Sequence, residues 1–461
     1  MTKLSPLAPP TISAKAQSKK TGSGACGPRF FVALAVGLVW IGPAYWDRRF
    51  IFAMFLWDTL ILLAWLADWK RLPPPPEIEV TRIWLEPLYM CVETPVELTV
   101  SHTSSRPLNV TAMDDLPPTL RGEAPRAEIR VTGRGQAKYC VLPRRRGDIE
   151  AGPVFLRYRS RAQLAERWAV AGLQQVVRVY PDIRESRHHA LYLIRSRQIE
   201  MEKRLKRIPG AGRDFESLRE YQAGDEPRDI CWTATARRGK LITKVAQPER
   251  SQAVMIVLDA GRLMLARAAS APCAFSKLDC AIQAALNLSY VALYSGDAVG
   301  LLVYGRKVQA RLPAGRGSRH LRIILEQLCQ VRGELLEADH AHAAELLLKN
   351  LNRRSLILWL TDLAETAGTP DVIDGAARLW PRHLVVFTAI SQPELDCLVA
   401  RKPDSIAEMY RYVAAQQVIE RRELLLRQIR NRGVLAMQLA PAQLASGLIN
   451  RYLEVKERSL L

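Results

Sequence analysis

Cysteine pairs, phosphate loops and catalytic signature motifs are missing from this sequence. Its eight cysteines are scattered with no C-x-x-C pair, the short spacing that zinc sites and redox motifs use. Such usage favours reduced thiols in a cytosol-facing protein. No G-x-x-x-x-G-K-[ST] loop, G-x-S-x-G elbow or H-E-x-x-H helix occurs, so ATP hydrolysis and common hydrolase chemistry have no recognisable basis. The sequence therefore predicts a protein that is not an enzyme.

Acidic residues are the scarcer charge, with 46 Asp+Glu against 66 Lys+Arg and a formal net charge of +20. This excess favours anionic partners, either nucleic acid or lipid headgroups. Aromatic residues make up only 7% and fall mostly in apolar segments, whereas a nucleic-acid groove interleaves them with bases. We therefore regard nucleic acid as the weaker of the two expected partners.

Two apolar segments lie close together near the N-terminus. Phe30 to Trp46 carries no charge, and Phe50 to Trp69 carries only Asp58 and Asp68. Both are long enough for short membrane-spanning helices, and the three residues between them leave room only for a tight turn. Residues 30–70 are therefore predicted to form a two-helix membrane anchor. Asp58 lies near the middle of the second segment and is expected to face the partner helix, because a carboxylate in lipid is costly.

Basic residues flank the predicted anchor unevenly. Arg48 and Arg49 lie between the helices, whereas the bases outside them are Lys15, Lys19, Lys20, Arg29, Lys70, Arg71 and Arg82. Because cytoplasmic segments carry the excess of Lys and Arg, we expect two membrane passes with both termini and the soluble domains in the cytoplasm.

The remaining chain divides by composition. Four prolines, 73–76, predict a stiff polyproline spacer that lifts the next domain off the membrane. Short alternating runs broken by Pro, Gly, Asp and Ser predict an antiparallel β-sandwich. The expected domains are a polar tail (1–29), the anchor (30–70), the β-sandwich (77–181), a linker helix with a charged segment (182–250) and an α/β domain (251–461).

Continuous apolar runs alternate with helix-period segments in the last domain. The expected strands are residues 253–259, 298–305, 355–362, 383–390 and 434–439. Buried strands joined by helices predict a doubly wound α/β domain with a parallel sheet. Asp259 and Asp362 end two of these strands, where functional groups collect in such sheets.

Two histidines in the same domain have metal-ligand chemistry but not metal-ligand spacing. His340 and His342 are two residues apart, a separation that does not place both rings on one helix face. We expect a solvated helix start capped by Asp339 instead.

The segment from Gly212 to Leu241, GRDFESLREYQAGDEPRDICWTATARRGKL, is dense in opposite charges. Because Arg can hold a carboxylate through two parallel N–H bonds, the segment either fixes two domains together or forms a docking surface for a partner. No nucleophile accompanies the charges, which argues against a catalytic site. The charges single out Glu216, Arg219, Asp225, Arg228 and Arg237. The family resemblance described next singles out Phe215, Tyr221, Gly224 and Trp232.

This segment resembles the signature of the bacterial "domain of unknown function 58" family. The apolar helices, the VYPD motif and the terminal VLAMQLAPAQLASGLINRYLEVKER extend the resemblance over nearly the whole chain. The resemblance implies a protein of the bacterial inner membrane with a von Willebrand factor A-like domain, associated with a MoxR-type AAA+ ATPase that would supply the missing phosphate chemistry. A family signature is not a mechanism.

From the residues and the resemblance together, we expect a membrane-anchored, non-enzymatic adaptor or scaffold. It would contact membrane lipid, the MoxR-type ATPase and a client protein during complex assembly or remodelling. The alternatives are a membrane-linked nucleic-acid-binding protein and an envelope enzyme of unknown chemistry.

The von Willebrand fold often carries a magnesium site with D-x-S-x-S after its first strand, a threonine and a later aspartate. Here the first loop reads DAGRL from Asp259, without either serine, while Asp362 matches the last position and Ser318 at most replaces the threonine. Two carboxylates beside Arg262 make a poor octahedral oxygen shell. We therefore expect no cofactor at this degenerate site, with Arg262 paired to one of the aspartates.

Overall fold

The structure is a computed structural model, and it divides into two compact units, Met1–Pro181 and Asp182–Leu461. The residues it describes are 10–17, 24–47, 49–104, 106–121, 124–182, 214–222, 227, 230–247, 252–268, 275–364 and 369–458. The predicted linker helix within 182–250 lies outside the described residues.

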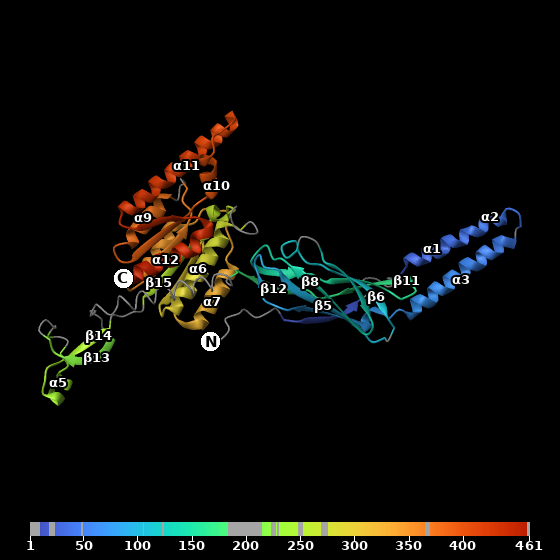
Figure 1. Cartoon of the computed structure of the whole chain (residues 1–461), viewed down its shortest axis with the longest axis horizontal. Coiled ribbons are helices and arrows are strands. Elements are labelled where there is room, and N and C mark those ends of the chain that lie inside the picture. The colour runs from blue at the N-terminus through green and yellow to red at the C-terminus, as the bar shows by residue number, and fades with distance from the viewer. Residues whose placement is uncertain are drawn as a thin grey trace. The chain divides into compact units, whose positions relative to one another are not determined.

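Two apolar helical stretches pack against each other in the first unit (Figure 1). They comprise α1 (Pro28–Gly37), η1 (Leu38–Trp40) and α2 (Ile41–Ala44), followed by α3 (Arg49–Arg71). α3 is long and apolar enough to cross a membrane, and the apolar stretch Pro28–Pro43 is shorter. Trp57 Nε1 donates to the carbonyl of Ala33 over 2.9 Å. Asp58 faces the partner helix as predicted, because a Cβ on Gly37 would lie 3.0 Å from its Oδ1.

The rest of this unit is strand-rich and antiparallel. One sheet runs β7-β6-β10-β11-β1-β3-β5-β8, with β2 on β11, and a smaller sheet runs β4-β12-β9. Leu98 and Val100 from one half share a core with Val110 and Leu156 from the other, which is the burial expected when a sheet folds over on itself. The strands are β1 (Ile12–Gln17), β2 (Gly24–Cys26), β3 (Ile78–Trp84), β4 (Leu88–Tyr89), β5 (Thr94–His102), β6 (Leu108–Asp114), β7 (Arg126–Val131), β8 (Arg134–Val141), β9 (Gly147–Ala151), β10 (Val154–Arg159), β11 (Ala165–Ala171) and β12 (Gln175–Tyr180).

The prediction of a polar tail over residues 1–29 is wrong for β1 and β2. β1 pairs with β3 on one side and β11 on the other, and it alternates faces, so that Lys15 is exposed while Ala16 is buried. Strands that precede the helices in sequence are therefore bonded to strands that follow them. Both outer ends of the helical pair consequently lie at the same side of that pair.

The four prolines do not act as a spacer. Pro75–Glu77 forms a short 3-10 turn, η2, that leads straight into β3. The Tyr158 hydroxyl donates to the carbonyl of Pro73 over 2.9 Å, and Arg167 lies 4.7 Å from the ring centroid of Trp69. The end of α3 is therefore fixed directly to the sandwich.

The sequence suggested that Arg82 is one of the basic residues exposed beside the anchor, and this prediction is wrong. Its side chain is fully buried in an ion pair with Asp114, and it also donates to the carbonyls of Leu173 and Gly152, each at 2.9 Å. Burial of this guanidinium is tolerated because its N–H groups donate to a carboxylate and to two backbone carbonyls. Without Arg82, the basic residues outside the two helices still outnumber Arg48 and Arg49 between them.

The second unit contains a small hairpin and an α/β domain. The hairpin pairs β13 (Asp214–Glu220) with β14 (Ile242–Gln247), and a short helix, α5 (Trp232–Arg238), lies between them in sequence.

The α/β domain has the strand order β17-β16-β15-β18-β19-β20, parallel except for β17 at one edge. The predicted strands are confirmed to within two residues at their ends. β17 was not predicted, because it is a partly exposed edge strand containing Pro313. The strands are β15 (Ala253–Asp259), β16 (Ala298–Tyr304), β17 (Val308–Gly315), β18 (Leu356–Thr361), β19 (Leu384–Ile390) and β20 (Leu435–Leu439).

Helices cover both faces of this sheet (Figure 1). On one face α6 packs with α7 and α12, and on the other α8, α9 and α11 close over Val257, Trp359 and Phe387. The domain is therefore doubly wound, as predicted. The helices are α6 (Lys277–Tyr294), α7 (Gly317–Gln330), α8 (His340–Asn350), α9 (Thr369–Leu379), α10 (Pro393–Ala400), α11 (Ile406–Asn431) and α12 (Leu444–Glu457), with 3-10 turns η4 (Arg262–Leu265) and η6 (Pro441–Gln443).

Candidate functional site

The candidate site lies where the winding of the sheet reverses. From β15 the chain continues to β16 on one side, and it later returns to β18 on the other side of β15. Loops diverge at such a switch point, so side chains at the carboxyl ends of the two central strands face a shared space. Asp259 ends β15 and Asp362 follows β18, so the structure brings the two predicted aspartates to this point.

Asp362 is neutralised by two buried cations. Lys277 Nζ lies 2.6 Å from its Oδ2, and an Arg422 side-chain nitrogen lies 3.0 Å from its Oδ1. Arg422 also donates to the carbonyl of Leu363 over 3.0 Å. The side chains of Lys277, Asp362 and Arg422 are 1%, 5% and 6% exposed. Such burial is sustained only when each charge is paired and hydrogen-bonded.

The two cations come from helices that are far apart in the sequence, α6 and α11. Lys277 is the first residue of α6, after Ser276, which forms a reciprocal capping box with Asp279. A cation in the first turn opposes the helix dipole, so the start of α6 alone does not favour a lysine there. The Asp362 carboxylate supplies the compensating attraction. Arg422 comes from the middle of α11 and is one of few buried side chains on that helix.

Asp259 is held by donors of a different kind. Its Oδ2 accepts from the Thr361 hydroxyl over 2.6 Å, and its Oδ1 accepts from the Gly261 backbone N–H over 2.7 Å. Burial raises the pKa of Asp259 to about 6 against the opposing effect of these two hydrogen bonds, and the nearby Asp362 and Glu334 carboxylates raise it further. A raised pKa makes this carboxyl easy to neutralise without a metal.

Arg262 does not pair with either aspartate, so that expectation is wrong. Its guanidinium lies 3.3 Å from Glu337 Oε1, and both side chains are largely exposed. The loop turns Arg262 outward, and Lys277 and Arg422 take the role predicted for it. Ser318 is an exposed residue of α7, and no described contact joins it to either aspartate.

The groups present do not fit a magnesium ion. Magnesium requires near-octahedral oxygen ligands, and the place beside Asp362 is filled by an ammonium and a guanidinium. A Cβ on Gly261 would lie 2.9 Å from the backbone nitrogen of Ala338, so the loop leaves little room for a serine there. The described residues contain no cluster of three or more His, Cys, Asp or Glu side chains able to hold a metal.

A buried polar chain next to this site was not foreseen. Trp359 Nε1 donates to the Tyr304 hydroxyl over 2.7 Å, and that hydroxyl lies 2.9 Å from His340 Nδ1. His340 is thus partly buried and not solvated, although Asp339 does cap the helix as predicted, accepting from His342 N over 2.9 Å. Burial lowers the pKa of His340 to about 4, so the ring is neutral at neutral pH and its Nδ1 shares one hydrogen bond with the Tyr304 hydroxyl. The only signal for these hydrogen bonds in the sequence is that Tyr304 and Trp359 lie in predicted strands.

The described part of the charged segment lies in the hairpin and in α5. Tyr221 is at the end of β13, and its N–H donates to the carbonyl of Leu241 over 2.9 Å. Trp232 is 67% exposed and Arg237 is exposed on the same short helix, α5. Phe215, Glu216 and Arg219 belong to β13, while Gly224, Asp225 and Arg228 lie outside the described residues.

Comparison with known proteins agrees with the resemblance over the centre of the chain. The family described as "Protein of unknown function DUF58" matches residues 217–398. Uncharacterized proteins of Mycobacterium tuberculosis and Mycobacterium bovis are each 26% identical over 162 residues, which cover 34% of this chain and 48% of theirs. The chain therefore spans about half the length of the curated relatives it matches.

Solved structures show weaker likenesses. The conserved hypothetical protein BatB from Bacteroides thetaiotaomicron is 16% identical with a TM-score of 0.32, covering 45% of this chain and 100% of that chain. An uncharacterized membrane spanning protein from Vibrio fischeri is 16% identical with a TM-score of 0.18, covering 44% of this chain and 99% of that chain.

Proposed function

We propose that this chain is a membrane-anchored, non-enzymatic adaptor that works with a MoxR-type AAA+ ATPase in protein complex assembly or remodelling. The observation that carries the proposal is the closure of the α/β site by Lys277 and Arg422. With Asp362 saturated by two cations, the point where such a sheet normally binds a ligand or metal performs a structural task. Energy for remodelling must then come from another protein.

The first unit supports the anchoring half of the proposal. α3 has the length and hydropathy of a membrane span, and α1 to α2 packs along it. Since β1 and β3 share a sheet, the helical pair must leave and re-enter on one side, as two membrane passes require. The excess of bases at that side favours a cytoplasmic location for both units in the inner membrane.

The hairpin supports the docking half. Tryptophan and arginine are enriched in binding hot spots, and Trp232 and Arg237 are both exposed on the short helix α5. We propose that this surface contacts the ATPase, and that the von Willebrand factor A-like domain presents the client. The alternative in which the segment only joins domains predicts that its exposed side chains are dispensable.

Binding between purified components tests the proposal. The full chain in detergent micelles should bind the MoxR-type ATPase from the same organism, and Trp232→Ala should weaken binding by about 2 kcal/mol or more, the loss typical of a hot spot. Trp168→Ala is the matched control, because Trp168 is a 55% exposed tryptophan of the sandwich. Equal affinities of both variants and wild type for the ATPase would show that the surface around Trp232 does not bind it. Binding of DNA in place of the ATPase would favour the nucleic-acid alternative.

A further inference from the structure

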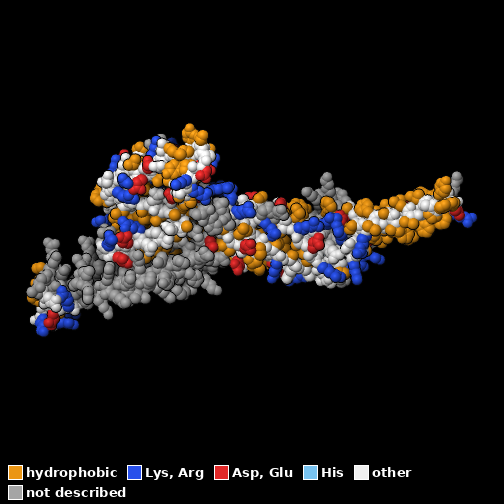
Figure 2. Space-filling view, turned by 45° about the horizontal axis from the view of Figure 1, so that its top comes forward, with side chains coloured by type: hydrophobic (Ala, Val, Ile, Leu, Met, Phe, Trp, Pro, Cys, Tyr) orange, Lys and Arg blue, Asp and Glu red, His pale blue; other side chains and the backbone are white. Residues whose placement is uncertain are grey.

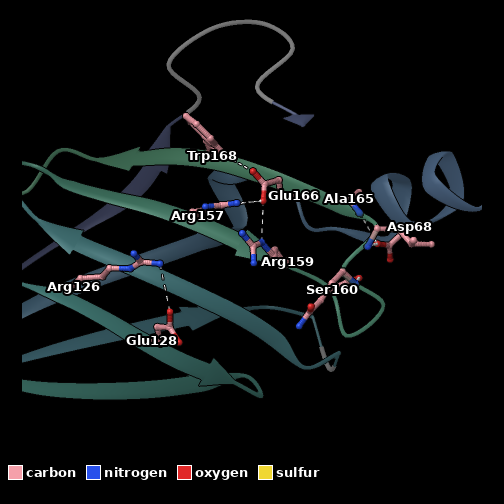
Figure 3. Close-up of polar contacts among 11 residues, drawn as sticks. Asp68, Arg126, Glu128, Arg157, Arg159, Ser160, Ala165, Glu166 and Trp168 are labelled. Atoms are coloured by element: carbon pink, nitrogen blue, oxygen red, sulfur yellow. Dashed lines mark hydrogen bonds and ion pairs between the residues drawn. The ribbon is translucent and has the colours of Figure 1, made fainter. Parts of the chain in front are cut away.

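The junction between the helices and the sandwich is tightly bonded. Asp68, near the end of α3, is buried and its Oδ2 accepts the N–H groups of Leu164 and Ala165 at 3.2 and 3.0 Å (Figure 3). Gly27, just before α1, donates its N–H to the carbonyl of Leu164 over 2.7 Å. The turn between β10 and β11 is therefore fixed to both helices at once.

Four exposed basic side chains surround this junction. Arg29 follows Gly27 on α1, Lys70 and Arg71 follow Asp68 at the end of α3, and Arg161 lies in the fixed turn. We call these four residues the basic collar. Figure 2 shows Lys and Arg side chains gathered where the apolar helices meet the sandwich.

Nearby carboxylates do not neutralise the positive charge of the basic collar. Asp68 is occupied by backbone donors, and Glu166 is buried, accepting from Arg157, Arg159 and Trp168 (Figure 3). Although burial alone would raise the pKa of Glu166, these hydrogen bonds lower it on balance. Glu77 is exposed in η2, so Glu77 and Asp68 together offset at most two of the four positive charges.

We propose that the basic collar binds the phosphate headgroups of anionic lipids and so holds the sandwich against the membrane surface. The inference rests on the proposed anchoring, because the collar lies at the end of the apolar helices, at the level of the lipid–water boundary. Trp65 and Trp69 lie at the same level, with ring centroids 6.5 Å apart, and both pack partly against the sandwich core. Tryptophan is enriched at the level where a membrane meets water. Each base near an anionic surface strengthens binding roughly fivefold, and the rigid junction keeps all four bases at that surface.

The choice of lipid over nucleic acid follows from this position. A duplex would have to enter the headgroup layer to reach Lys70 and Arg71, whereas lipid phosphates already lie there. The aromatic neighbours of the collar, Phe30 and Trp69, each lie against Trp65, with ring centroids 6.3 and 6.5 Å from its ring. They are therefore engaged with protein, whereas single-stranded nucleic acid needs aromatic faces on which its bases can stack.

The test uses the full chain in detergent micelles, titrated with short-chain phosphatidylglycerol or phosphatidylcholine and followed by native mass spectrometry. The collar variant is Arg29→Gln/Lys70→Gln/Arg71→Gln/Arg161→Gln. The control variant removes the same charge from exposed positions outside the collar, Arg126→Gln/Lys138→Gln/Arg144→Gln/Arg145→Gln.

We expect saturable binding of phosphatidylglycerol but not of phosphatidylcholine. The collar variant should lose roughly fivefold in affinity for each charge removed, the factor that corresponds to about 1 kcal/mol, and the control should bind as wild type does. Equal binding by the two variants, or preferential binding of a DNA duplex at the collar, would overturn the inference. Circular dichroism of both variants verifies that they are folded.

Alkaline carbonate extraction of membranes separates this inference from the anchoring proposal. Wild type and both variants should all remain in the pellet, because the apolar helices and not the collar provide the insertion energy. Release of wild type would contradict anchoring itself. Retention of wild type without any preference for phosphatidylglycerol would contradict the collar alone.

Discussion

Lys277 places its ammonium nitrogen 2.6 Å from Asp362 Oδ2, with both side chains almost completely buried. The two residues are 85 positions apart in sequence: Lys277 begins α6 on one face of the sheet, and Asp362 follows the central strand β18. This pair, completed by Arg422, sets the electrostatics of the site, because it places two protein-borne positive charges against one carboxylate.

Removing the anion from this cluster should cost more stability than removing one cation. Asp362→Asn leaves Lys277 and Arg422 buried without a carboxylate, which should cost about 3–5 kcal/mol in the free energy of unfolding. Lys277→Met leaves Asp362 still paired with Arg422 and should cost less. Denaturant unfolding of the α/β domain measures both. The reverse order would contradict the assignment of Asp362 as the centre of the cluster.

Magnesium should not bind at the switch point. Calorimetric titration of the full chain with Mg²⁺ or Mn²⁺ should give no stoichiometric heat, because Lys277 and Arg422 already occupy the Asp362 carboxylate and oppose a further cation beside it. Asp259→Ala should give an identical trace. A stoichiometric site tighter than roughly millimolar, about 4 kcal/mol of binding free energy, that Asp259→Ala abolishes would show that the loop is a working metal site.

The stability of the α/β domain should fall as pH rises through the titration of Asp259. Its pKa is raised from 3.8 to about 6 in the folded chain, so between these values the folded state holds a proton that the unfolded state has lost. This group's stabilising contribution is therefore present below pH 3.8 and is lost by neutral pH, amounting to about 3 kcal/mol.

Asp259→Asn removes that dependence and is the test for it. The free energy of unfolding of the variant, relative to wild type, should improve steadily between acidic and neutral pH. A difference that stays constant over this range would mean that Asp259 has an ordinary pKa in the folded chain.

Neighbouring residues on β1 should respond oppositely to the same substitution. Ala16→Asp places a carboxylate in the sandwich core and should cost several kcal/mol in the free energy of unfolding, whereas Lys15→Asp on the exposed face should change it by less than about 1 kcal/mol. Thermal unfolding of the full chain in detergent measures both. Equal tolerance of the two substitutions would mean that β1 is not part of the sandwich.

The parallel sheet could be predicted because its strands are continuous apolar runs. The sequence from Ala253 to Asp259 is buried on both faces, so its pattern alone specifies a central strand. β1 could not be predicted in this way. Its residues alternate weakly, and its partners lie on the far side of two apolar helices in sequence. Pairing of this kind depends on tertiary contacts that local patterns do not contain.

The two carboxylates of the site could be predicted from the sequence, whereas its two basic residues could not. Asp259 and Asp362 could be located because strand ends are visible in the sequence. Arg262 was the nearest base in sequence, but the loop turns it outward to Glu337. Lys277 and Arg422 lie on helices whose rotation about their axes no local pattern specifies, so their approach to Asp362 appears only in three dimensions.

We propose that the chain is an adaptor for an ATPase and not an enzyme itself. The most direct test is the ATP hydrolysis rate of the purified MoxR-type ATPase, measured as the chain in lipid nanodiscs is added. We predict that the chain alone hydrolyses no ATP, that it changes the rate of the ATPase saturably at equimolar amounts, and that Trp232→Ala reduces this effect while Trp168→Ala does not. An unchanged rate at every ratio, together with no detectable complex, would contradict the claim.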